Sequence, residues 1–233
     1  MRVFVDPSVL AAGELVVRGD EHHYLSHVRR ARVGDVVELV DGSGRRATAT
    51  ITAIAHNATT LTVGAPEAIE SKPPFVRALI PLIKGDRMDT CLEKLVEVGV
   101  DEIVVWAAAR AVVRLDADRR ESRLAKFVAM VQAAARQSGR AQVPTVQIVD
   151  DAIAGLTSTS MRILLDPASD ARIAPGDVRE ITVASGPEGG FTVDELDAFT
   201  RAGFAPVGLG PRILRAETAP VVAVALIRAL THS

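Results

Sequence analysis

After residue 75 the sequence alternates short apolar runs with amphipathic helical patterns, and this alternation constrains the fold more than any other feature. Between residues 86 and 98, apolar side chains recur at the spacing of one helix face, at Met88, Cys91, Leu92, Leu95 and Val96. We expect strands at 76–83, 103–106, 162–165, 181–184 and 204–209, and further helices at 119–138, after Thr192 and after Thr218. Strands that alternate with helices predict an α/β fold whose mostly parallel sheet is covered on both faces.

The first 70 residues have a different pattern, which is typical of a small β-barrel. Short runs rich in β-branched residues occupy 36–40, 46–54 and 59–63, and 41–44 is an Asp-Gly-Ser-Gly turn between the first two. Prolines interrupt the pattern between residues 65 and 74 and mark a linker. We therefore expect two domains, a β-barrel over 1–72 and an α/β domain over 73–233.

Composition excludes several classes of protein. The apolar run at 221–227 is far shorter than the ~18 residues that span a bilayer, and the first residues lack the apolar core of a secretory signal. The single Cys91 lies on the apolar helix face, which predicts an inert core thiol and excludes an intramolecular disulfide. A cytoplasmic protein without a membrane segment is the expectation.

The formal net charge is −2, yet basic residues gather in two places. Residues 110–140 contain eight basic and three acidic side chains, and Arg29, Arg30 and Arg32 follow His22, His23 and His27. Either run, taken alone, is equally well explained as a solvated helix face. Two such clusters on an acidic chain favour a partner that carries phosphates. The histidines lack acidic or thiol residues at ligand spacing, so we expect no metal site.

Three irregular loops follow predicted strands in the second half, at 165–167, 185–191 and 209–218. In open α/β sheets, ligands bind outside the carboxyl ends of the strands, so these loops are candidates for one pocket wall. The loops 185–191 and 209–218 contain glycines, and either of them, taken alone, is more simply explained as a tight turn. The glycine spacing matches neither a dinucleotide-binding fingerprint nor a P-loop.

At these loops the sequence resembles the RsmE family. The resemblance rests on Gly-Pro-Glu-Gly-Gly-Phe at 186–191 and Leu-Gly-Pro-Arg-Ile-Leu-Arg-Ala-Glu-Thr-Ala at 209–219. Segments 23–30, 84–100 and 137–144 are also similar to family segments, so the likeness covers nearly the whole chain. Arg136 stands where the family usually has Glu, and we assign no role to that position.

The resemblance implies an S-adenosylmethionine-dependent enzyme that methylates N3 of a uridine in 16S ribosomal RNA of the small ribosomal subunit. It also implies a C-terminal trefoil-knotted SPOUT domain, an N-terminal PUA-like barrel and an obligate homodimer with the active site at its interface. Two alternatives stay open: a knotted RNA methyltransferase with another target, such as a ribose 2′-hydroxyl, and a non-catalytic RNA-binding ribosome assembly factor.

The resemblance and the chemistry of the loops together give a set of site residues. The expected catalytic residues are Arg212, Arg215 and Glu217, with Glu188 as another possible proton acceptor. A structural role explains Glu217 equally well, because a carboxylate near the start of a helix interacts favourably with the helix dipole. The expected cofactor-binding residues are Leu165, Asp166, Ser185, Gly186, Glu188, Gly189, Gly190, Leu209, Gly210, Ile213, Leu214 and Thr218. The expected RNA-binding residues are His27, Arg29, Arg30, Arg32, Lys84, Arg87, Gln137 and Arg140.

Overall fold

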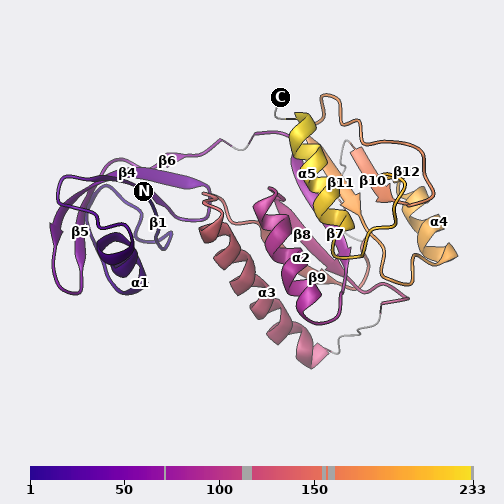
Figure 1. Ribbon diagram of the computed structural model, residues 1–233, viewed down its shortest axis with the longest axis horizontal. Helices are drawn as coiled ribbons and strands as arrows, with labels where there is room; N and C mark the ends of the chain where they lie inside the picture. Colours follow the sequence, from indigo (N-terminus) through magenta and orange to yellow (C-terminus); the bar gives the residue numbers. More distant parts are fainter. Residues whose placement is uncertain (71, 112–116, 154–155, 157–160, 232–233) are drawn as a thin grey trace. The chain divides into compact units, whose positions relative to one another are not determined.

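The structure is a computed structural model, and it describes all residues except 71, 112–116, 154–155, 157–160 and 232–233. The chain forms two compact units (Figure 1). One contains Met1–Ser71 with Ala135–Val143, and the other contains Lys72–Ala134 with Pro144–Ser233. Two charged residues of the basic run, Arg114 and Asp116, lie outside the described residues.

The first unit is built on a six-stranded, mostly antiparallel sheet. Its strands are β1 (Arg2–Phe4), β2 (Gly13–Val17), β3 (Val36–Val40), β4 (Arg45–Ile54), β5 (Thr59–Val63) and β6 (Glu67–Ala68). They are ordered β1-β3-β4-β5-β2, with β6 pairing with β4. The three strands predicted from the sequence are confirmed, whereas β1, β2 and β6 were not predicted. Strand β6 lies within the stretch expected to be a linker, where it pairs with the start of β4.

A short helix in the first unit also escaped the sequence analysis. Helix α1 (Gly19–His23) continues into the π-helical turn η1 (Tyr24–Val28), where Leu25 is buried in the core. His22 is buried too, and its ring is 2.8 Å from the Thr59 hydroxyl. This packing fixes one side of the segment against the sheet and leaves His27 and Arg29 at the surface.

Residues 135–143 join the first unit through several contacts. The Arg136 guanidinium is 3.4 Å from Glu21 and lies over the Phe4 ring, 5.6 Å from its centroid. Burial raises the pKa of Glu21, and the Arg136 charge only partly offsets this. Arg2 donates a hydrogen bond to the Gly139 carbonyl. These contacts explain why a segment distant in sequence belongs to this unit.

The second unit contains one six-stranded sheet in which every pair of neighbouring strands is parallel. The strands are β7 (Phe75–Pro81), β8 (Glu102–Trp106), β9 (Thr145–Val149), β10 (Met161–Leu165), β11 (Glu180–Ala184) and β12 (Ala205–Val207), in the order β12-β10-β11-β7-β8-β9. The helices are α2 (Asp86–Glu97), α3 (Ala117–Gln137), α4 (Val193–Arg201) and α5 (Ala219–Thr231).

The central strands confirm the sequence prediction of a parallel sheet. Four successive residues are buried in β8, Ile103 to Trp106, and four in β11, Ile181 to Ala184. Because neighbouring side chains point to opposite faces, such runs require both faces to be covered. Helix α4 begins directly after Thr192, as predicted, and Thr192 and Glu195 form a capping box there.

The last helix is tied back to the beginning of this unit. Helix α5 packs against α2, β7 and β11, and it buries Ala223, Val224 and Ile227 completely. Arg228 donates hydrogen bonds to the Gly99 and Pro74 carbonyls and pairs with Asp101. Helix α5 is thus part of the core. Within the described residues, no helix is long and apolar enough to cross a membrane.

Candidate active site

A pocket of about 410 Å³ lies at the carboxyl edge of the parallel sheet, within the second unit. Its walls come from the loops after β10, β11 and β12, the three loops that the sequence singled out. Pockets of this volume class accommodate small ligands and cofactors. The expectation that these three loops lie together is therefore met by the fold.

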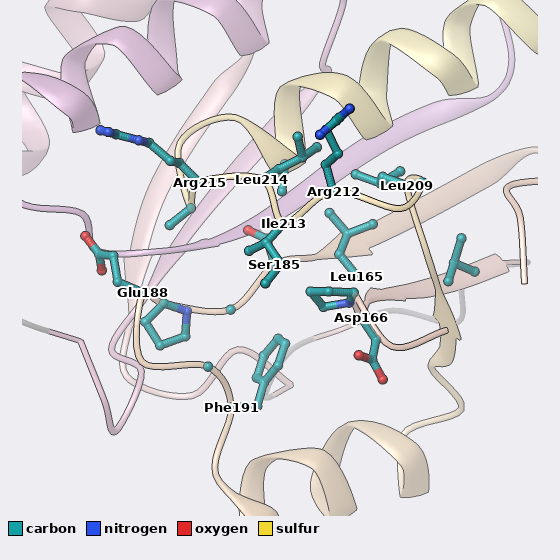
Figure 2. A pocket seen from close by; sticks show the side chains of 18 of the residues that line it. Leu165, Asp166, Ser185, Glu188, Phe191, Leu209, Arg212, Ile213, Leu214 and Arg215 are labelled. Carbon is teal, nitrogen blue, oxygen red and sulfur yellow. The ribbon is translucent and has the colours of Figure 1, made fainter. Parts of the chain in front are cut away.

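Most of the residues expected to bind a cofactor line this pocket. They are Leu165, Asp166, Ser185, Gly186, Glu188, Gly190, Leu209, Gly210, Ile213 and Leu214. Figure 2 shows Glu188 and Arg215 at one side of the pocket and Leu209, Arg212 and Asp166 at the other. The described lining does not include Gly189, Thr218 or Glu217, whereas it does include Arg87.

Two glycines shape the pocket wall, one by a close approach and one by its backbone conformation. A Cβ on Gly186 would lie 2.9 Å from the Phe191 ring, so the start and end of the 185–191 loop pack directly together. Gly210 has φ +121°, in the left-handed region that L side chains rarely adopt. Ser185 is buried, and its amide donates to the Leu79 carbonyl, which fixes the loop where it leaves β11.

Four charged side chains form a connected network at the Glu188 side of the pocket. The Arg87 guanidinium is 3.0 Å from the Glu188 carboxylate and 3.8 Å from that of Glu217. Arg215 is also 3.8 Å from Glu217. The two arginines thus share one carboxylate, and the network joins α2 to the loops after β11 and β12.

Glu217 is set behind the pocket surface. Its side chain is only 12 % exposed, and within the described part of the chain its Oε2 atom is buried without a hydrogen-bond partner.

Burial, with a smaller contribution from the Glu217 charge, raises the pKa of the Cys91 thiol to about 12. Cys91 is fully buried, as the sequence predicted for a core thiol.

Sequence reasoning missed the part played by the loop after β8. Arg110 donates hydrogen bonds to the carbonyls of Gly189 and Phe191, at 3.1 and 3.2 Å. The neighbouring Ala109 amide donates to Glu195, which also caps α4. The loop that carries Glu188 is therefore held from outside the pocket. In the sequence, the only sign of this role of Arg110 is its position shortly after a predicted strand.

The residues expected to bind RNA lie in both units. His27, Arg29, Arg30 and Arg32 are exposed in the first unit, and Arg30 has φ +51°, a strained conformation for this residue. Gln137 and Arg140 are in the segment 135–143 of the same unit. Lys84 is exposed in the second unit. Among the described residues, no group of His, Cys, Asp and Glu has the arrangement of a metal site.

Comparison with known proteins identifies the chain. The model of the RNA methyltransferase domain matches residues 70–228, and that of the RNA methyltransferase PUA domain matches residues 17–63. The parallel sheet, the pocket at its carboxyl edge and these matches define an RNA methyltransferase.

Individual relatives are similar along nearly the full length. The chain is 32 % identical to ribosomal RNA small subunit methyltransferase E of Mycobacterium tuberculosis, covering 99 % of this chain and 92 % of that protein. The Synechocystis protein of the same name is 31 % identical, covering 100 % and 78 %. The Neisseria gonorrhoeae protein of that name, solved bound to S-adenosyl methionine, is 30 % identical with a TM-score of 0.80, covering 98 % and 97 %. The chain belongs to this family, the RsmE family.

Proposed function

We propose that the protein transfers the methyl group of S-adenosylmethionine to N3 of a uridine in 16S ribosomal RNA of the small subunit. The observation that carries this proposal is the full-length similarity to enzymes named for the small-subunit RNA, combined with a pocket that includes both loop motifs of the resemblance. The SAM-bound relative supports the choice of cofactor.

The pocket lining suits this cofactor. Leu165, Leu209, Ile213 and Leu214 provide an apolar wall for an adenine ring or a methylthio chain. Gly186 and Gly210 line the pocket, and backbone groups near them are the candidates to bind the polar edge of a nucleoside. Bound there, S-adenosylmethionine supplies a methyl group already activated as a sulfonium.

The remaining task of the protein is to make the acceptor nucleophilic. N3 of uracil carries a proton between two carbonyls, so its attack requires loss of that proton and stabilisation of negative charge on O2 and O4. Arg212 and Arg215 line the pocket and supply cationic donors for those oxygens. Glu188 and Glu217 are the carboxylates available to accept the proton or to hold the arginines.

We assign the first unit to RNA binding. Its exposed Arg29, Arg30 and Arg32, with Arg140 of the same unit, would contact phosphates. The match of a PUA domain of RNA methyltransferases to residues 17–63 supports this role. The acceptor uridine must be unpaired or turned out of a helix, since base pairing hides N3.

We also propose that the second domain, which begins at residue 73, forms a trefoil knot. We further propose that the protein is cytoplasmic and forms a homodimer in which the partner subunit completes the active site. The order of strands supports the knot: β12 is the outer neighbour of β10, while α5 returns to β7 and β11. The bond from the Gly208 amide to the Ala171 carbonyl brings two of the site loops together. Light scattering of the purified protein tests the dimer.

The test of the function is to react the purified protein with small ribosomal subunits that lack the modification and to map the product nucleoside by mass spectrometry. The expected product is 3-methyluridine in 16S RNA, formed only with S-adenosylmethionine. A 2′-O-methyl nucleoside would replace this proposal with the other methyltransferase activity. Absence of both product and calorimetric heat with S-adenosylmethionine would favour an assembly factor.

A further inference from the structure

We propose that Arg87 is a positioning residue of the methyl-transfer site that balances charge beside the acceptor base, and that it is not a contact to RNA phosphates. This inference rests on the proposed function and deepens it. The sequence grouped Arg87 with Lys84 as RNA-binding residues, and the structure separates the two.

The position of Arg87 follows from the fold. It lies in the first turn of α2, directly after the central strand β7, so its side chain starts at the carboxyl edge of the sheet. The Arg87 side chain is 40 % exposed and lines the pocket. Lys84, three residues earlier, is exposed and is absent from the described lining.

The partners of Arg87 come from two different site loops. Glu188 belongs to the loop after β11, and Glu217 immediately precedes α5. The short 3.0 Å ion pair with Glu188 holds that carboxylate at the pocket wall. The longer 3.8 Å contact with Glu217 sets Arg87 beside Arg215, which pairs with the same carboxylate. A single guanidinium therefore fixes the relative positions of two loops.

The charges explain why this matters for the reaction. Arg87 and Arg215 together neutralise Glu188 and Glu217, so this side of the pocket carries no net charge. Removing Arg87 leaves one excess negative charge, part of it on the poorly solvated Glu217. Negative charge next to the base opposes ionisation at N3 and the build-up of charge on O2 and O4. Removing Arg87 therefore slows the chemical step more than it weakens RNA binding.

The test compares Arg87→Ala, Arg87→Lys and Lys84→Ala in full-length protein with small subunits as substrate. We expect Arg87→Ala to lower kcat by about 100-fold while changing KM for RNA less than threefold. Arg87→Lys retains the charge and recovers part of kcat. Lys84→Ala raises KM for RNA with little loss of kcat.

Two results would overturn the proposal. One is an Arg87→Ala variant that resembles Lys84→Ala, with raised KM and normal kcat. The other is an Arg87→Lys variant no faster than Arg87→Ala, which would show that the positive charge at this position is not the role. If the wild-type protein methylates an atom other than N3, the proposed function fails, and the same kcat and KM comparison on that product still decides the role of Arg87.

Discussion

The carbonyl oxygen of Ser169 lies so close to Gly208 that a Cβ built on the glycine would clash with it. The contact is reinforced by the Ser169 hydroxyl, which donates to the Pro206 carbonyl at 3.0 Å. The loop after β10 thus packs backbone to backbone on the chain that leaves β12. Both segments continue into the pocket wall, so the contact sets part of the pocket's shape.

We therefore expect Gly208→Ala to destabilise the protein by about 3 kcal/mol or more, since neither backbone can move away cheaply. Urea unfolding followed by circular dichroism measures the effect. Gly176→Ala is the matched control: this glycine has φ +58° with open space around it, so only backbone strain of about 1 kcal/mol is expected. Equal effects of the two substitutions would contradict the steric explanation.

Arg110→Ala is expected to weaken S-adenosylmethionine binding by about tenfold, although Arg110 is not among the described pocket-lining residues. The substitution removes two hydrogen bonds to the loop that carries Glu188, each worth about 1 kcal/mol. Isothermal titration calorimetry measures the affinity, and Arg201→Ala, an exposed arginine on α4, is the control. An unchanged affinity would mean that the loop holds its shape without Arg110.

Arg30→Glu is expected to weaken RNA binding and to reduce the salt dependence of binding by about one unit of slope. Affinity for S-adenosylmethionine should stay the same, because Arg30 belongs to the first unit and the pocket to the second. Filter binding at several salt concentrations gives the slope. Arg30→Gln controls for the strained backbone at this position. Loss of cofactor binding in Arg30→Glu would contradict the assignment.

Asp41 is expected to stabilise the first unit at neutral pH. Burial opposes its ionisation, but hydrogen bonds from Ser43 and Arg45 outweigh that effect and lower the pKa of Asp41. Because the pKa of Asp41 is lower in the folded state than in the unfolded state, its ionisation stabilises the fold. This stabilisation is complete at pH values above the unfolded-state pKa of about 3.9, and it is lost as the pH falls through the folded-state pKa.

Asp41→Asn should accordingly lower the free energy of unfolding by about 1–2 kcal/mol at pH 7, and the difference from wild type should shrink below pH 4. Urea titrations at several pH values measure this. Glu14→Gln, at an exposed position on β2, serves as the control. A constant difference at all pH values would show that the charge of Asp41 plays no part.

How far the sequence predicted the structure depended on the length and burial of each element. The strand at 36–40 was placed to the residue because its apolar run ends at a clear turn. By contrast, β9 was missed because it is a half-exposed edge strand without a continuous apolar run. The π-helical turn at Tyr24–Val28 has no periodicity that sequence patterns detect.

The pocket was predictable because parallel strands bring all their carboxyl ends to one edge, so motifs that follow strands must meet there. The roles of single side chains within it were not. Arg87 was expected among the RNA-binding residues and Glu217 among the catalytic residues. Only coordinates reveal that one lines the pocket and that the other lies behind it.

The anchoring of α5 by Arg228 has a consequence during protein synthesis. Helix α5 packs against β7, which is the first strand of its unit to be translated. Strand β7 therefore lacks part of its packing until residues 219–231 have left the ribosomal tunnel. The second unit therefore cannot complete its folding strand by strand during translation. Its candidate active site forms only once helix α5 has been synthesised and has packed into this core.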